Sequence, residues 1–219
     1  MIDKSTFDFL ADLKKNNRRE WYNANKDRFK ESQQNFIDFV AMILFRISEF
    51  DPDMIGTEPK NCLFRIYRDI RFSKDKTPYK TWFSAGMNPG GRKRMGAGYY
   101  IHVEPGDCYI GGGVWHPDKE TLSAIREYII GWPNQFNAIV NESGFVKMFG
   151  GLKGDKLKVA PKGYPKDHLQ IKWLRYKDFI VSKNFHDEEL QSGKCFDTAY
   201  DVYHQMADFI FYLRKAIKQ

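Results

Sequence analysis

The sequence predicts an α+β domain in which a mainly antiparallel sheet of four to five strands is packed by N-terminal helices and a long C-terminal helix. Three observations lead to this prediction. Apolar residues recur at helical spacing over residues 5–50. Residues 62–115 instead form short runs of aromatic and β-branched residues divided by Gly and Pro, which is typical of strands joined by hairpins. Helical spacing returns after residue 117.

Two short helices are predicted at the N-terminus. The first begins at Ser5, because Asp8 three residues later resembles a capping box. It is expected to end at Asn16-Asn17. The second is expected to run from Arg19 to Phe29.

Three further helices follow from apolar stripes. One precedes Asp51-Pro52, which is expected to end it. Its stripe consists of Phe36, Phe39, Val40, Ile43, Ile47 and Phe50. Another helix is expected from Pro117 to about Ile130. The C-terminal helix has a stripe formed by Ala199, Val202, Tyr203, Met206, Phe209, Ile210, Leu213 and Ile217.

Five segments have the composition of strands. They are Cys62–Phe72, Thr81–Asn88, Gly98–Glu104, Asp107–Trp115 and Asp178–Phe185. Pro105-Gly-Asp107 is short enough to be a hairpin connection. Residues 150–168, rich in Lys, Gly and Pro, are expected to form a surface loop.

The chain is expected to form one domain over residues 1–219, with a helical part (1–52), a central sheet (60–116) and a second helical part (117–219). Its three cysteines are far apart and include no C-x-x-C, which argues against a disulfide framework or a zinc site. Neither a secretion signal nor an apolar stretch long enough to span a bilayer is evident, so a cytoplasmic protein with no membrane partner is expected.

Positive charge is concentrated in one segment. Residues 60–98 contain ten Lys or Arg against two acids, a net +8 in a chain whose total is +7. The basicity is therefore local. A positive field of this density favours a bound anion and attracts one from solution.

The residues that carry the anion hypothesis lie between positions 65 and 80. We expect a pocket lined by Arg65, Arg71, Lys76 and Lys80, because guanidinium groups contact phosphate or carboxylate through two parallel hydrogen bonds. Asp69 would orient an arginine, and Tyr67 or Tyr79 would contact the rest of the ligand. Asp69 and Tyr79 are also the candidate acid–base groups if catalysis occurs.

The alternative for this segment is structural. If residues 63–72 form a strand, Arg65, Asp69 and Arg71 would be an ordinary cross-strand charge ladder. Arg68 would share the other face with apolar residues, where a charge requires a fixed partner. For Arg68 we therefore favour a structural role with an acidic partner elsewhere. For the other residues we favour ligand binding.

Two other features invite a functional interpretation. His102 and Glu104 are two residues apart in a predicted strand, and with His116 they would be the first metal ligands to consider. We favour a solvated face there and predict no metal. Gly111-Gly112-Gly113 fits a phosphate cradle and the close approach of another backbone equally well. The sequence identifies no cofactor.

The basic segment also resembles a known family. The pattern Arg65-x-x-Arg68-Asp69-x-Arg71-Phe72-x-x-Asp75-Lys76-x-x-Tyr79 is similar to the signature of the domain of unknown function 2461 family. Further similarity covers Phe7-x-Phe9-Leu10, Asn16-Asn17, Trp21, Tyr99-Tyr100 and Trp115-x-Pro117, and so extends over most of the chain. The resemblance implies a mainly bacterial protein. It supplies no catalytic residues.

Three functions remain open, in order of preference. The first is a site for a phosphorylated or nucleotide-like small molecule, with or without catalysis. The second is nucleic-acid binding by a basic sheet face on which Tyr67, Tyr99 or Trp82 stacks with bases. The third is a non-enzymatic module whose basic face docks an acidic protein.

Overall fold

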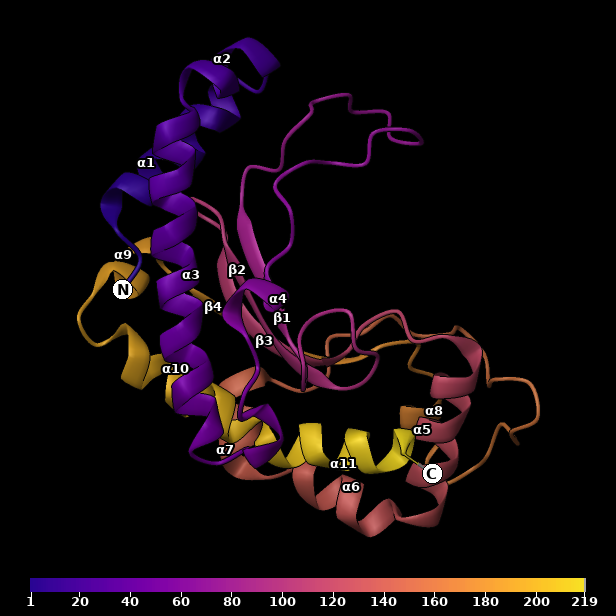
Figure 1. The fold of residues 1–219 in the computed structure, drawn as a ribbon. Coiled ribbons are helices and arrows are strands. Elements are labelled where there is room, and N and C mark those ends of the chain that lie inside the picture. The colour runs from indigo at the N-terminus through magenta and orange to yellow at the C-terminus, as the bar shows by residue number, and fades with distance from the viewer. Residues whose placement is uncertain (219) are drawn as a thin grey trace. The chain divides into compact units, whose positions relative to one another are not determined.

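A computed structural model describes residues 1–218 of the chain and has an α+β fold, as predicted (Figure 1). Its antiparallel sheet has four strands, within the expected four to five. These are β1 (Phe83–Met87), β2 (Gly98–Val103), β3 (Cys108–Val114) and β4 (Phe179–Phe185), in spatial order β1-β2-β3-β4. All four lie inside predicted segments. The predicted hairpin joins β2 to β3, where the Asp107 N–H donates to the Glu104 carbonyl at 2.9 Å.

The chain divides into two compact units. The first contains residues 1–94, 100–110 and 184–201, and the second contains residues 95–99, 111–183 and the C-terminal segment from Val202. Strands β2, β3 and β4 each contribute residues to both units. This division does not test the single domain expected over residues 1–219, which stays a prediction.

The first unit is built from N-terminal helices packed on β1. These are α1 (Lys4–Lys15), α2 (Arg19–Ala24) and α3 (Lys26–Ser48), followed by the short helices η1 (Pro52–Met54) and α4 (Pro59–Cys62). Phe36 of α3 stacks on Phe83 of β1 with ring centroids 5.5 Å apart. The predicted stripe of α3 is buried from Phe36 to Ile47. Each such side chain contributes about 1.5–3 kcal/mol by leaving water.

Two helices late in the sequence, α9 (Asp187–Gln191) and most of α10 (Cys195–Gln205), complete the first unit. The second unit contains α5 (Lys119–Gly131), α6 (Pro133–Val140), α7 (Ser143–Phe149), α8 (Ile171–Leu174) and α11 (Ala207–Ile217). Its core is aromatic: the Phe136 ring lies 5.2 Å from that of Tyr212 and 5.4 Å from that of Trp173. No helix within residues 1–218 has the length and apolar character needed to cross a membrane.

Three predicted helix boundaries were wrong. The first helix has Asp3 at its N-cap, so Ser5 lies inside it. The predicted helix Arg19–Phe29 is interrupted at Asn25, whose amide donates to the Trp21 carbonyl at 2.9 Å; Asn favours helix ends for this reason. The long C-terminal helix is two helices divided at Met206, where an N–H bond to the Tyr203 carbonyl, three residues back, tightens the turn.

The predicted strand Cys62–Phe72 was also wrong. Cys62 ends α4, and the residues after it pair with residues 77–85 only through isolated bridges, Leu63 with Ala85 and Tyr67 with Tyr79. Short polar side chains satisfy nearby backbone groups instead: Asp69 accepts from the Arg71 N–H at 3.2 Å, and Asp75 accepts from the Thr77 N–H at 2.9 Å. Such local bonds compete with a continuous ladder. We call residues 63–82 the basic ribbon.

The glycine run in β3 has a structural explanation. Gly113 adopts φ 123°, and a Cβ there would lie 1.9 Å from the carbonyl oxygen of Phe179 in β4. A Cβ on Gly111 would lie 2.8 Å from the Val181 carbonyl oxygen. The run therefore permits close approach of the neighbouring backbone.

We predict that Gly113→Ala destabilises the protein by at least about 2 kcal/mol, because the substitution combines an unfavourable φ with a backbone clash. Urea unfolding followed by circular dichroism measures this. Gly131→Ala is the matched control: a Cβ at this position in α5 meets nothing within 4 Å. The control should be neutral or stabilising by up to about 1 kcal/mol. Equal effects of both substitutions would contradict the prediction.

Candidate functional site

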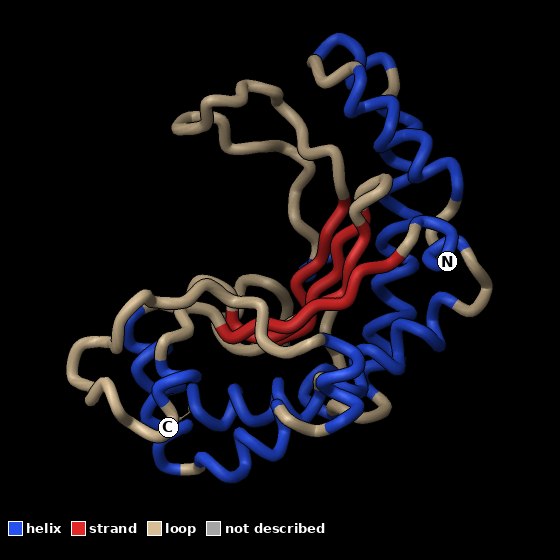
Figure 2. The backbone as a smooth tube through the Cα atoms, turned by 180° about the vertical axis from the view of Figure 1, so that it is seen from behind, coloured by secondary structure: helices blue, strands red, loops and turns tan. Residues whose placement is uncertain are grey.

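The basic ribbon extends beyond the end of β1 (Figure 2). Side chains of the N-terminal helical segment contact it at Tyr79. The Asn17 side chain forms two hydrogen bonds with the backbone of Tyr79: its amide donates to the carbonyl at 2.9 Å and its oxygen accepts from the N–H at 3.1 Å. The Tyr79 ring stacks on Tyr22 of α2, with centroids 4.2 Å apart. This anchor fixes the position of the residues on either side of Tyr79.

At the tip of the ribbon, two arginines are already paired with neighbouring acids. Arg68 pairs with Asp75 and also donates to Thr77. Asp69 and Arg71 form a two-bond pair, Nη2 to Oδ2 at 2.7 Å and Nε to Oδ1 at 3.0 Å.

Lys76 contributes one more contact at the tip, donating to the carbonyl of Ile70 at 2.9 Å. The acidic partner of Arg68 is Asp75, which lies within the ribbon itself, whereas a partner elsewhere was expected from the sequence.

The tip pairs lower the pKa values of both acids. The Arg71 side chain and backbone N–H hold the pKa of Asp69 at about 2, from an ordinary 3.8. The Thr77 N–H and then the Arg68 guanidinium hold the pKa of Asp75 at about 2 as well. Both carboxylates are therefore charged throughout the physiological range. Their partners Arg68 and Arg71 are correspondingly less available to an external anion.

Near the base of the ribbon, two cations lie against one aromatic ring, and the charge of a third, Arg65, acts on one of them. The Lys80 Nζ lies 5.4 Å and the Arg92 Cζ 5.2 Å from the centroid of Phe64. Arg92 is held there by its Nε, which donates to the Leu63 carbonyl at 2.6 Å. We call Arg65, Lys80 and Arg92 the basal cluster.

No ion pair among the described residues neutralises the basal cluster, although the charge of Arg65 also acts on Asp69. Within residues 1–218 none of its three side chains forms an ion pair. Burial lowers the pKa of Lys80, and the positive charges of Arg65 and Arg92 lower it further. The depressed pKa of Lys80 reflects burial first and then repulsion by the two arginines. An anion bound among them would relieve that repulsion.

A row of aromatic side chains continues from the basal cluster onto the sheet. Trp82 lies 6.0 Å from the Lys80 Nζ and 5.4 Å from the ring of His102 in β2. His102 stacks on Tyr109 of β3 at 4.8 Å with an interplanar angle of 11°. Tyr100 lies between Phe64 and Tyr109, at 6.2 Å and 5.7 Å. The basal cluster therefore borders an aromatic surface.

On the side of this aromatic surface away from the basal cluster lie two acidic side chains, those of Glu104 and Asp107. His102, Glu104 and Asp107 each direct one potential ligand atom into a common region, all within 4.8 Å of one another. Burial lowers the pKa of His102, although Glu104 partly opposes this, so its imidazole is neutral at pH 7. His116 does not belong to this group; it lies in the second unit, with its Nδ1 3.2 Å from Asp178.

The sequence-predicted residues thus separate into three groups. Arg65 and Lys80 meet in the basal cluster, Asp69, Arg71 and Lys76 meet at the tip, and Tyr67 and Tyr79 pack beside Tyr22. Tyr79 is 4% exposed, and its burial raises its pKa. Sequence reasoning did not assign a role to Phe64 or Arg92. The basic loop after Pro89 was the available signal for Arg92.

The expected stacking role of Tyr99 was wrong. Its side chain is 1% exposed and packs edge-on against Tyr203 at 5.6 Å in the second unit. Alternation along β2 places Tyr99 on the opposite face from Tyr100. Trp82 and Tyr67, the other two residues proposed to stack, are partly exposed.

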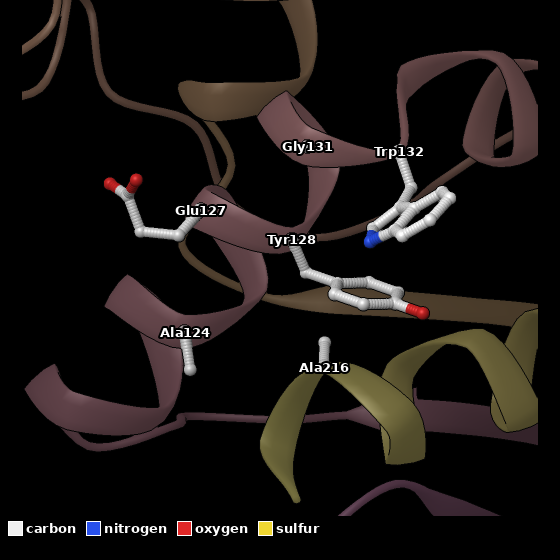
Figure 3. Close-up of a pocket in the computed structure, with 6 residues that line it drawn as sticks. All are labelled: Ala124, Glu127, Tyr128, Gly131, Trp132 and Ala216. Carbon is white, nitrogen blue, oxygen red and sulfur yellow. The ribbon is translucent and has the colours of Figure 1, made fainter. Parts of the chain in front are cut away.

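The second unit contains a cavity of about 300 Å³ lined mainly by α5 and the end of α11 (Figure 3). Its lining residues are Ala124, Glu127, Tyr128, Gly131, Trp132 and Ala216. The only ionisable groups among them are the Glu127 carboxylate, which accepts from Tyr164 at 2.7 Å, and the Tyr128 hydroxyl. It contains none of the residues implicated by the sequence and offers no cation for an anion.

Comparison with known proteins identifies the family. A family model described as conserved hypothetical protein (DUF2461) matches residues 5–212, and the chain belongs to this family. No curated protein and no solved structure matches the chain. The resemblance based on the basic segment is confirmed.

We predict that Asn17→Ala makes the base of the ribbon more mobile. Loss of both hydrogen bonds to Tyr79 should lower stability by about 1–3 kcal/mol. It should also accelerate amide hydrogen exchange in residues 66–80, measured by mass spectrometry. The matched control is Asn16→Ala, whose side chain donates only within α1, to the Asp12 carbonyl at 3.0 Å. Unchanged exchange in the Asn17 variant would contradict the anchor.

A second prediction concerns the tip. Arg71→Ala should raise the pKa of Asp69 part of the way from about 2 towards 3.8, because the backbone N–H at position 71 still donates. The lowered pKa contributes stability above pH 3.8 that is lost as the pH falls towards 2. Carboxyl NMR titration measures the change, with Asp75 as the internal control. A shift of Asp75 equal to that of Asp69 would argue against two separate pairs.

Proposed function

We propose that the protein binds a phosphorylated or nucleotide-like small molecule at the basal cluster and the adjoining aromatic surface. The observation that carries the proposal is that Lys80 and Arg92 lie against Phe64, close enough to Arg65 for its charge to act on Lys80, and that none of the three forms an ion pair within residues 1–218. Cations that repel one another and are partly removed from water are costly. A bound anion would offset that cost.

Phosphate suits this arrangement better than a single carboxylate. A phosphate group offers several acceptor oxygens and up to two negative charges, whereas the cluster offers two guanidinium forks and one ammonium. Arg92 is oriented by its bond to the Leu63 carbonyl, which leaves its remaining N–H groups available. Arg92 therefore loses less conformational entropy when a ligand binds.

The aromatic neighbours favour a ligand with a flat or apolar portion. Phe64 is 36% exposed, and Trp82 and Tyr100 are also partly accessible. Rings of this kind stack on bases or pack against apolar ligand surfaces. A nucleotide combines both features, with its phosphate at the basal cluster and its base on the aromatic surface.

Nucleic acid is the second candidate because exposed aromatics and cations also occur at the ribbon tip. Phe72 is 95% exposed, and Arg71 lies 5.9 Å from its centroid. A single strand would use both the tip and the basal cluster, whereas a compact ligand would use the basal cluster alone. This difference distinguishes the two candidates.

The test is a thermal-shift and calorimetric comparison of inorganic phosphate, mononucleotides, sugar phosphates and a single-stranded oligonucleotide at two salt concentrations. A mononucleotide or sugar phosphate should raise the melting temperature. Arg65→Gln, Lys80→Gln and Arg92→Gln should each weaken its binding about 10- to 100-fold, since one charge-assisted hydrogen bond contributes about 1.5–3 kcal/mol. Binding should also weaken as rising pH deprotonates Lys80.

Two further variants complete the design. Lys30→Gln removes a lysine on α3 that pairs with Asp27, and it should leave binding unchanged. Arg71→Gln should have little effect on a compact ligand because Arg71 is bound to Asp69. Loss of binding in Arg71→Gln would place the anion at the tip. Stabilisation by the oligonucleotide alone, abolished at high salt, would replace the small-molecule proposal with nucleic-acid binding.

A further inference from the structure

We propose that His102, Glu104 and Asp107 form a binding site for a divalent first-row transition metal ion such as Zn²⁺ or Mn²⁺. The three residues direct the His102 ring nitrogen and one oxygen from each carboxylate into a region where all three atoms lie within 4.8 Å of one another. The proposal goes beyond anion binding and does not depend on it.

The spacing of the atoms fits a metal. The His102 Nε2 lies 3.4 Å from the Glu104 Oε2. Two donors that each bind an ion at about 2.0–2.2 Å in tetrahedral or octahedral geometry lie roughly 2.8–3.6 Å apart. The two atoms are also within hydrogen-bond reach of each other, at the long end of the range. An ion between them would replace this long contact with two short bonds.

The buried imidazole is aimed into the group by its surroundings. His102 is 7% exposed and lies flat against Tyr109, at 4.8 Å. Its other ring nitrogen, Nδ1, lies 3.3 Å from the Tyr100 hydroxyl. Ligating histidines are commonly oriented by such a contact on the second nitrogen. The Nε2 atom is thereby turned towards Glu104.

Glu104 is oriented in the same manner. Its Oε1 accepts from the Thr81 hydroxyl at 2.8 Å and lies 3.3 Å from the Lys14 Nζ. Both contacts engage one oxygen and leave Oε2 towards His102. Lys14 also reduces the net negative charge of the group formed by His102, Glu104 and Asp107. A reduced charge favours a metal site with an imidazole ligand over a site that attracts a cation by negative charge alone.

Asp107 is placed by the β2–β3 hairpin. Its N–H bonds to the Glu104 carbonyl, and Gly106 in the turn adopts φ 80°. Both oxygens of Asp187 accept from the Gly106 N–H at 3.0 Å, which secures the turn from outside. Within residues 1–218 the Asp107 carboxylate forms no ion pair. It is an available ligand on a fixed turn.

The donor set indicates the class of ion. Imidazole favours Zn²⁺ and related ions over Mg²⁺ and Ca²⁺, which prefer oxygen ligands, and the two carboxylates also suit Mn²⁺. Three protein ligands leave coordination positions for water or a further ligand. The site would therefore be open.

The test measures metal binding directly. Chelator-treated protein is dialysed against Zn²⁺, Mn²⁺ or Mg²⁺ without phosphate or nucleotide, and bound metal is counted by mass spectrometry. We expect one Zn²⁺ or Mn²⁺ per chain and no retention of Mg²⁺ at the same concentration. Glu104→Gln and Asp107→Asn should each weaken binding at least about tenfold, and Thr81→Val about tenfold through loss of the orienting bond.

Controls separate this site from others on the chain. His116→Gln removes an exposed histidine that also lies beside a carboxylate, Asp178, and it should not change metal binding. Co²⁺ substitution should give a visible spectrum of nitrogen and oxygen ligands. A thiolate charge-transfer band, equal binding in Asp107→Asn, or loss in His116→Gln would overturn the proposal. Asp107 is exposed, so Asp107→Asn should fold like the parent protein. Circular dichroism of the variant verifies that a loss of metal binding is not caused by unfolding. Absence of any bound metal would also overturn it, without bearing on the anion proposal.

Discussion

The anchor between Asn17 and Tyr79 is the contact on which the geometry of the candidate site depends. The basic ribbon has few ladder bonds, so it cannot specify its own course. Asn17 supplies a donor and an acceptor to the Tyr79 backbone, which is what a neighbouring strand would do. The stack of Tyr79 on Tyr22 adds apolar contact worth about 0.5–1.5 kcal/mol beyond burial. The next residue is Lys80, so an anchor that fixes Tyr79 also fixes the centre of the basal cluster.

The positively charged side chains of the ribbon lie in two different environments, one at its tip and one at its base. At the tip, Arg68 and Arg71 are paired with acids that lie within seven residues of them in the sequence. Exposed pairs of this kind contribute little to stability, so their main effect is to shape the turn. At the base, Lys80 is partly buried beside two like charges and has no acid. Charge that is left unneutralised where water is partly excluded is typical of a binding site. The contrast explains why net charge alone could not identify which cations matter.

The sequence predicted the regular elements well and the ribbon poorly, for physical reasons. Aromatic and β-branched residues around a Pro-Gly turn determine β2 and β3, and the period of the α3 stripe determines that helix, because both signals are local. Asp69 and Asp75 instead bond to backbone two residues ahead, so a strand-like composition produced an irregular ribbon. The separation of Arg71 from Lys80 followed from that folding. The approach of Arg92 to Phe64 is a tertiary contact across 28 positions, for which one sequence carries no direct signal.

The proposed anion and metal sites are close enough to influence each other. The charge of Lys80 acts on His102 and opposes a second positive charge there. An anion bound at Lys80 would cancel that repulsion and make a cation at His102, Glu104 and Asp107 more favourable. Because coupling between two binding equilibria is reciprocal, the metal ion would strengthen anion binding by the same factor. The aromatic surface between them, formed by Trp82 and its neighbours, would hold the remainder of a ligand whose charged group lies at the basal cluster. A sheet face with a cation cluster at one side and a group of one imidazole and two carboxylates at the other thus fits one composite site.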